Sequence, residues 1–305
     1  MTLIRTENLT KKFGEFVAVD GLTLSVNAGE ILALLGPNGA GKTTTVRMLG
    51  SILKPTSGTA TIAGNDVVAD ARQVRSIVGL LTEFPGLYHR MRADAYLHFF
   101  GELQGLGRAQ REARIDELMK RFGMWGERER RLGEYSKGMR QKIALIRALL
   151  HDPRVLFLDE PTSAMDPQSA KMVRDAISDL RSSRRSIILC THNLVEAEAL
   201  ADRIAIIKEG KIIALGTPPE LKRDLLGSPL LELQLAERLD GLLPTIEGLV
   251  TVEDKGETWF RYRARVPGEV NPILVRRLSE TGASIVTLSE VPRSLEEVYL
   301  RIVED

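Results

Sequence analysis

The sequence predicts an α/β protein with a large domain built on a buried parallel sheet, followed by a small α+β domain. Short apolar runs at 31–35, 155–158 and 186–190 have the length of strands that are buried on both faces. Each run is followed directly by glycine or polar residues, as expected at the sheet edge where the carboxyl ends of parallel strands meet. From about Leu226 these features stop and the composition changes, which predicts the second domain.

Length and charge narrow the class of protein. A chain of 305 residues can hold one large and one small core. The net charge is +1 with both signs mixed along the chain, so no nucleic-acid partner is predicted.

The single cysteine, Cys190, excludes an internal disulfide and is typical of a reducing compartment. No run approaches the roughly 18 apolar residues that span a bilayer. The chain is therefore expected in the cytoplasm, and any membrane-spanning part would come from another chain.

One glycine-rich loop predicts a nucleoside triphosphate site and hence a P-loop NTPase core. The loop after the run at 31–35 fits the phosphate-binding pattern G-x-x-x-x-G-K-S/T at every fixed position. Its backbone N–H groups can converge on phosphate oxygens, and the helix that follows presents its N-terminus to the anion. Lys42 is expected between the β- and γ-phosphates, and Thr43 on Mg²⁺. The residues predicted to bind ATP here are Gly36, Pro37, Asn38, Gly39, Ala40, Gly41, Lys42, Thr43 and Thr44.

The segment before this loop predicts an antiparallel β subdomain. Residues 4–9 and 22–26 have the pattern of strands and are joined through a polar stretch that contains Phe13. An exposed aromatic ring near a nucleotide loop can stack on adenine, which is worth about 1 to 3 kcal/mol per base. Alternatively, Phe13 packs into the small sheet. Residue type leaves both interpretations open.

Residues 93–150 are predicted to form a helical subdomain. A helix start follows Ser136, whose side chain is a suitable N-cap. Between residues 93 and 122, apolar side chains recur at helical spacing and predict core positions. The two stripes are Tyr96, Leu97, Phe100 and Leu103, then Ile115, Leu118, Met119 and Phe122.

Polar groups follow two further predicted strands at the same sheet edge. Asp159 and Glu160 come directly after the run at 155–158. Asp159 is expected to hold Mg²⁺, and Glu160 to act as general base on the attacking water. A helix cap or solvent contact is the alternative for such an acidic pair, but the phosphate loop favours catalysis. His192 follows the next run, where it can sense a γ-phosphate.

Taken in order, these features resemble the ATP-binding subunit of an ABC transporter over residues 1–224, which leaves 225–305 as an accessory domain. The matches are Phe13 with the adenine-stacking aromatic, 36–44 with the Walker A loop, 155–160 with the Walker B strand and catalytic glutamate, 163–166 with the D-loop that contains Asp166, and His192 with the switch histidine. The resemblance implies catalytic roles for Lys42, Glu160 and His192.

Residues 135–141 resemble the signature motif of the same family, which binds the γ-phosphate held by the opposite subunit. Ser136, Lys137 and Gly138 are thereby implied nucleotide contacts. Two nucleotides would be sandwiched in a head-to-tail homodimer or heterodimer that works with separate transmembrane permease subunits.

Several positions depart from the common family pattern. Glu83 stands where glutamine is usual; the resemblance implies that it contacts nucleotide and Mg²⁺, but it adds negative charge near the γ-phosphate. Tyr135 and Lys137 replace leucine and glycine in the signature, and Met165 replaces leucine in the D-loop. Lys137 either tightens ATP binding or points into solvent.

The predicted elements of the second domain form a small α+β unit whose order is compatible with a ferredoxin-like fold. Its predicted strands are 230–235, 250–253, 258–266 and 283–289, with a helix at 271–280. Arg261, Arg263 and Arg265 alternate with apolar residues, so one strand face is basic and is either solvated or in contact with lipid or a partner. The residues 294–297 form a capping box for a last helix. This ending resembles that of ATPase subunits of bacterial drug, lipid or sodium exporters.

The leading hypothesis is therefore an ATPase subunit on the cytoplasmic face of the membrane that drives an exporter through ATP-dependent dimer closure. A soluble ABC-type ATPase acting on ribosomes or DNA is one alternative, although its usual coiled coils and cysteine-rich insertions are not visible. An ATP-binding regulatory module with weak hydrolysis is another, motivated by Glu83 and Lys137.

Overall fold

The computed structural model describes residues 1–82, 86–163, 165–181, 185–239, 241–292, 294–297 and 299, apart from the side chain of Leu225. The chain divides into two compact units, Met1–Pro218 and Pro219–Asp305. The expected domain limits, residues 1–224 and 225–305, stay a prediction. In the described part of the chain, no helix has both the length and the apolar character needed to cross a bilayer.

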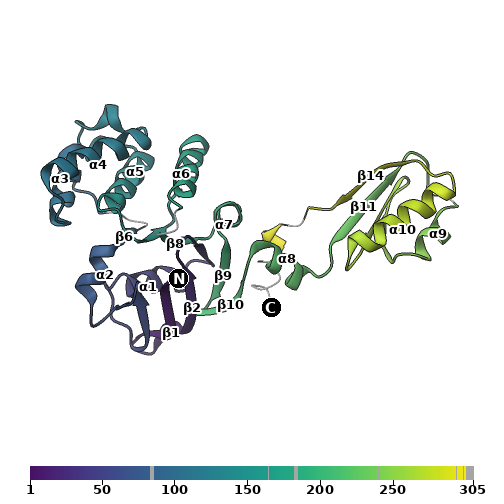
Figure 1. Cartoon of the computed structure of the whole chain (residues 1–305), viewed down its shortest axis with the longest axis horizontal. Coiled ribbons are helices and arrows are strands. Elements are labelled where there is room, and N and C mark those ends of the chain that lie inside the picture. The colour runs from purple at the N-terminus through teal and green to yellow at the C-terminus, as the bar shows by residue number, and fades with distance from the viewer. Residues whose placement is uncertain are drawn as a thin grey trace. The chain divides into compact units, whose positions relative to one another are not determined.

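A four-stranded antiparallel sheet forms one layer of the first unit (Figure 1). Its order is β2 (Phe16–Asn27), β1 (Thr2–Phe13), β4 (Ser57–Ile62) and β5 (Asn65–Asp66). The first two strands are longer than the predicted 4–9 and 22–26. Register shifts interrupt the alternation of buried and exposed residues in this pair of strands. The outer parts of the strands therefore lack the two-residue period by which a strand is recognised in the sequence.

The second sheet has six strands in the order β10 (Lys211–Gly216), β9 (Arg203–Lys208), β3 (Ile31–Leu35), β8 (Ser186–Thr191), β7 (Val155–Asp159) and β6 (Val78–Leu81). All neighbours are parallel except the β9–β10 hairpin. The residues of β3, β7 and β8 are buried throughout, because one sheet face packs toward the helical subdomain and the other toward α1 (Lys42–Leu49) and the antiparallel sheet. This arrangement confirms the predicted P-loop NTPase core.

The helical subdomain contains α3 (Ala93–Leu103), α4 (Arg108–Arg121) and α5 (Lys137–Leu149), with short turns η1 (Trp125–Glu127) and η2 (Leu132–Glu134) between the last two. Six of the eight predicted stripe residues are buried and Phe100 is partly buried. Leu103 is 66% exposed, so its core prediction is wrong. It is the last residue of α3, where the helix ends before Gly105 and no longer faces the core.

The first unit also contains α2 (Ala71–Ile77), α6 (Pro167–Asp179) and α7 (Leu194–Leu200), and α8 (Pro218–Leu226) begins at its last residue. Two of them follow strands whose ends build the site: α6 comes after β7, and α7 comes after β8. Each begins at a side-chain cap, Asp166 for α6 and Asn193 for α7. The loops between strand and helix are short, which restricts the positions of the polar residues in them.

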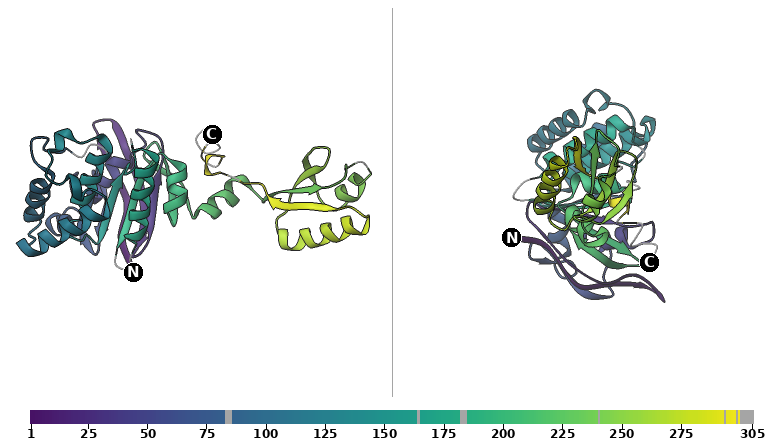
Figure 2. Two further views of the ribbon diagram at one scale, coloured as in Figure 1. Left: turned by 90° about the horizontal axis from the view of Figure 1, so that it is seen from above. Right: turned by 90° about the vertical axis from the view of Figure 1, so that its right-hand side faces the viewer.

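The second unit has the predicted ferredoxin-like order. Its elements are β11 (Leu230–Leu235), α9 (Leu243–Glu247), β12 (Val252–Lys255), β13 (Trp259–Arg263), α10 (Pro267–Glu280) and β14 (Ile285–Glu290). The antiparallel sheet has the order β12-β13-β11-β14, and Figure 2 shows α10 along one of its faces. The short helix α9 was not expected, because five residues give too little periodicity to detect.

Two of the three arginines of the predicted basic face, Arg261 and Arg263, are paired with acids on neighbouring strands, whereas Arg265 lies after β13 and is exposed. Nε of Arg261 donates to Glu232 at 2.8 Å, and its Nη1 lies 3.5 Å from Asp254. Nε of Arg263 donates to Glu253 at 2.7 Å. These pairs favour the interpretation of a solvated sheet face over a lipid-binding patch.

Only the start of the last predicted helix is described. The Ser294 hydroxyl accepts a hydrogen bond from the Glu297 backbone N–H at 3.2 Å, as a capping box requires. The side chain of Leu295 is buried.

Candidate active site

The phosphate loop is shaped by two glycines that no larger residue could replace. Gly36 leaves the end of β3, and a Cβ there would lie 2.3 Å from the Ile207 carbonyl oxygen. Gly41 precedes α1 with a φ of 103°, and a Cβ there would lie 2.4 Å from the Ala18 carbonyl oxygen. The close approach excludes a side chain at both positions, and the positive φ adds to this at Gly41. The fixed glycines of the sequence pattern are thus required by the backbone itself.

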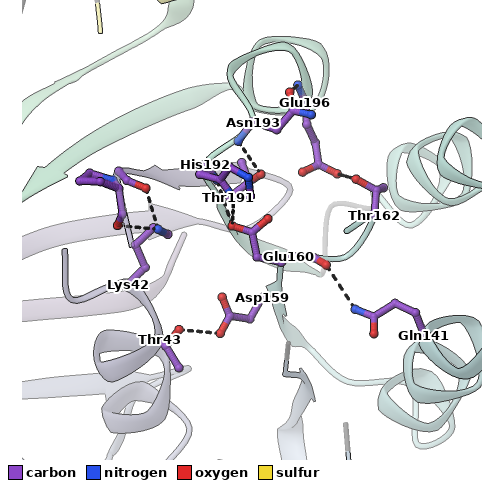
Figure 3. A network of polar contacts seen from close by, with 12 residues as sticks. Lys42, Thr43, Gln141, Asp159, Glu160, Thr162, Thr191, His192, Asn193 and Glu196 are labelled. Carbon is purple, nitrogen blue, oxygen red and sulfur yellow. Dashed lines mark hydrogen bonds and ion pairs between the residues drawn. The ribbon is translucent and has the colours of Figure 1, made fainter. Parts of the chain in front are cut away.

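The ammonium group of Lys42 lies inside this loop. Lys42 is the first residue of α1 and is only 7% exposed. Its Nζ donates hydrogen bonds to the carbonyl oxygens of Gly36 at 2.6 Å and Pro37 at 3.0 Å (Figure 3). The loop therefore surrounds a positive charge at the N-terminus of a helix, an arrangement that favours an anion.

Thr43 and Asp159 meet beside the loop. The Thr43 hydroxyl donates to Oδ2 of Asp159 at 2.7 Å, and Asp159 is 2% exposed at the end of β7 (Figure 3). A hydroxyl and a carboxylate are oxygen ligands of the kind that Mg²⁺ prefers. Among the described residues, no group of three or more acids, histidines or cysteines could hold a metal ion alone. The two residues fit an ion that takes its other ligands from phosphate and water. Glu83, also predicted here, lies outside the described residues.

Glu160 and His192 form the second polar pair of the site. Oε1 of Glu160 accepts hydrogen bonds from the backbone N–H of His192 at 3.0 Å and from its Nδ1 at 2.7 Å (Figure 3). The carboxylate is largely buried, whereas the histidine side chain is 62% exposed. Glu160 has a φ of 50°, which costs a residue with a Cβ about 1–3 kcal/mol. Backbone strain of this size requires surrounding contacts to hold it.

A cavity of about 320 Å³ lies beside the loop and the two acids, and Gly36, Pro37 and His192 are not part of its lining. Its lining consists of Phe13, Phe16, Ala18, residues 38–44, Asp159 and Glu160. Phe13 is 50% exposed, so its ring is not packed into the core of the sheet. Phe16 is the partner of Phe13 across the β1–β2 turn, is 63% exposed, and was missed from the sequence. Its place three residues after Phe13, across a glycine turn, is the signal that could have found it.

No residue of the segment 135–141 is part of the lining of this cavity. Ser136 caps α5 as predicted, since its hydroxyl accepts from the Met139 N–H at 3.2 Å. Ser136 and Lys137 are exposed, and Gly138 faces Met165. As the structure describes them, none of these three residues lines the 320 Å³ cavity.

Tyr135 replaces the usual leucine of the signature and is part of the core. It is 2% exposed, and its hydroxyl donates to the Glu127 carbonyl oxygen at 2.6 Å. Burial raises the pKa of the Tyr135 phenol to about 12, so the ring stays neutral at physiological pH. The larger side chain is therefore accommodated with its polar atom paired.

Gln141 joins α5 to the residue that follows β7, whereas Asp166 bonds within the start of its own helix. Nε2 of Gln141 on α5 donates to the backbone carbonyl of Glu160 at 3.2 Å, a contact with no sequence signal (Figure 3). Asp166 caps α6, where its Oδ1 accepts from the Ser169 N–H at 2.9 Å. That hydrogen bond lowers the pKa of the Asp166 carboxyl. Asp166 is thus held at a helix start, and its neighbour Ala164 lies outside the described residues.

A phosphate loop with a buried lysine, a hydroxyl–carboxylate pair and a glutamate held by a histidine defines the chain as a P-loop ATPase. A family model described as ABC transporter matches residues 19–163. The chain is 36% identical to the daunorubicin resistance ATP-binding protein DrrA2 of Streptomyces coeruleorubidus over 98% of its length and 94% of that protein. It belongs to the family of ABC transporter ATP-binding subunits.

Other relatives agree with this assignment. The Nod factor export ATP-binding protein I of Cupriavidus metallidurans is 35% identical over 98% of this chain and 97% of its own length. A solved ATP-binding subunit of an ABC transporter superposes with a TM-score of 0.69 at 27% identity, covering 74% of this chain and 94% of that one. The family resemblance predicted from the sequence is thereby confirmed.

Proposed function

We propose that this chain hydrolyses Mg·ATP with the residues described above and drives an ABC exporter. The observation that supports this most directly is that Thr43, Asp159 and Glu160 all line the cavity of the phosphate loop. Thr43 is hydrogen-bonded to Asp159, and His192, which lies outside the cavity lining, is hydrogen-bonded to Glu160. One pair offers metal ligands and the other a proton acceptor. An ATP-binding module without hydrolysis would need only the loop.

Each pair has one task in this mechanism. Mg²⁺, held by Thr43 and Asp159, would neutralise charge on the β- and γ-phosphates. Glu160 accepts the proton of the water whose oxygen forms the new bond to the γ-phosphorus, while the bond to the bridging oxygen breaks and ADP leaves. His192 donates to Glu160 through Nδ1 and so fixes the carboxylate. Lys42 exchanges its two carbonyl partners for phosphate oxygens.

The ring of Phe13, with Phe16 beside it, would stack on the base in this proposal. Glu83 is the remaining proposed contact to nucleotide and metal. Ser136, Lys137, Gly138 and Asp166 would reach the nucleotide held by a second subunit, identical or different. Their separation from the chain's own cavity supports this, because a helix start that is exposed is free to face another molecule.

Export is the proposed direction of transport. It is supported by relatives along almost the whole chain that are named for daunorubicin resistance and Nod factor export. We place the chain on the cytoplasmic face of the membrane, bound to separate permease subunits, with the ATPase domain at 1–224 and an accessory domain at 225–305. No nucleic-acid partner is proposed, since the net charge is +1.

The test is the mass in solution of the Glu160→Gln protein with and without Mg·ATP. Blocked hydrolysis should trap the closed state, so ATP is expected to convert monomer to dimer. The matched control is Glu198→Gln, which changes an exposed glutamate on α7. The dimer of this variant should dissociate after ATP turnover. A Glu160→Gln protein that hydrolyses ATP at the full rate would contradict the catalytic assignment.

A further inference from the structure

Two hydrogen-bonded pairs join the segment after β7 to the start of α7. The first is Glu160–His192. The second is Thr162–Glu196, in which the Thr162 hydroxyl donates to Oε1 of Glu196 at 2.7 Å (Figure 3). Thr162 lies two residues beyond Glu160, and Glu196 four beyond His192. The proposed catalytic pair Glu160–His192 is therefore one of two side-chain contacts that hold these two segments together.

The Thr162–Glu196 contact is not a by-product of helix capping. Asn193 caps α7 and accepts from the Glu196 N–H at 3.1 Å, which places Glu196 at the third helical position. In a capping box, a glutamate there turns back to the backbone N–H of the cap. Here the Thr191 hydroxyl accepts that N–H at 3.0 Å instead. The carboxylate of Glu196 is left to bind Thr162.

Burial makes this contact costly to lose. Glu196 is 2% exposed, and burial raises the pKa of its carboxyl. A buried carboxyl group is destabilising unless it is hydrogen-bonded. The hydroxyl group of Thr162 supplies such a bond. Glu198 lies two residues further along the same helix and is exposed, so the two glutamates of α7 differ in burial.

We propose that Glu196 is a positioning residue for ATP hydrolysis. It acts through Thr162, holding residues 160–162 against 191–193 so that the Glu160 carboxylate stays on His192. Glu160 needs such support, because its φ of 50° is strained. Its backbone N–H is already held by a hydrogen bond to the carbonyl oxygen of Cys190 on the neighbouring strand. This inference rests on the proposed catalytic roles of Glu160 and His192.

The experiment compares variants of the full chain that remove the contact with variants that keep it. Glu196→Ala and Thr162→Val remove it. They are expected to lower kcat about 10-fold with KM and the ATP dissociation constant within about twofold, because misplacement of a catalytic group affects the chemical step. Glu196→Gln and Thr162→Ser keep an acceptor or a hydroxyl and should stay within about twofold of the parent. Glu198→Gln is the matched control and should not differ.

The double variant Glu196→Ala/Thr162→Val separates positioning from general destabilisation. If the two residues act as one contact, its kcat equals that of the worse single variant. Additive losses, or losses that follow the melting temperature rather than the contact, would overturn the proposal. So would full activity of folded Thr162→Val. An active Glu160→Gln protein would instead refute the proposed function, so the two failures are distinguishable.

Discussion

The phosphate loop and the signature segment each precede a helix, but the two helix N-termini differ in capping and in exposure. Gly41 precedes α1 and has no side chain to cap it, and Lys42 is buried in the cavity. Ser136 caps α5 with its own hydroxyl, and Lys137 is exposed. The N-terminus of α1 therefore lies in a cavity of the chain. The N-terminus of α5 is exposed.

This difference suggests what each end can do alone. The phosphate-loop side holds a cavity lined by the proposed metal ligands, the proposed proton acceptor and two aromatic rings, so a single chain should bind ATP. The signature side contributes nothing to that cavity, so its substitutions should leave binding to a single chain unchanged. The predictions below test this division.

The largest effect is expected for Glu160→Gln on the loop side. Loss of the general base should reduce ATP turnover by about 100-fold or more, while ATP binding to the isolated chain persists because the phosphate loop is intact. Phosphate release and equilibrium ATP titration measure the two quantities. Loss of both together would show that Glu160 supports the loop rather than the chemistry.

Phe13→Ala and Phe16→Ala should weaken ATP binding next most. Removal of a stacking ring costs about 1 to 3 kcal/mol, which corresponds to roughly a 5- to 150-fold rise in the dissociation constant. Fluorescence or calorimetric titration of the single chain measures it. Phe99→Ala is the matched control, since Phe99 is 41% exposed and does not line the cavity. If the control weakens binding equally, the cavity assignment of both rings is wrong.

Ser136→Ala on the signature side should affect stability and leave ATP binding to the single chain unchanged. Loss of the cap to the Met139 N–H is expected to cost about 1 kcal/mol of unfolding free energy. Denaturant unfolding and ATP titration on the same sample test both parts. Weaker ATP binding by the monomer would break the division between the two ends.

Tyr135→Phe should have the smallest effect. The variant keeps the buried ring and loses the hydrogen bond to the Glu127 carbonyl, a change of about 0.5 to 1.5 kcal/mol in unfolding free energy. Turnover should stay at the parent level, because the hydroxyl faces the core. A clear fall in turnover with stability unchanged would mean that this departure from the family pattern acts on catalysis.

Local signals in the sequence were sufficient for the main sheet and the phosphate loop. The strand at 155–159 and its two acids are contiguous, and burial on both faces requires an unbroken apolar run there. The same logic failed at Leu103, where the helix ends, and at α9, which is too short to show a period. In the second domain the four strands and α10 were predicted in order, and β11 and β13 show the alternation of side-chain burial that indicates a strand.

The sequence by itself determined the family and the parallel core, and it located the loop that we propose binds phosphate, since each depends on neighbours in the chain. Tertiary structure alone decided which side chains meet: Thr43 with Asp159, Gln141 with the Glu160 carbonyl, and Thr162 with Glu196. It also showed that Arg261 and Arg263 are paired with acids on other strands. These contacts join segments far apart in the chain, and strand order and register set them, so no local pattern records them.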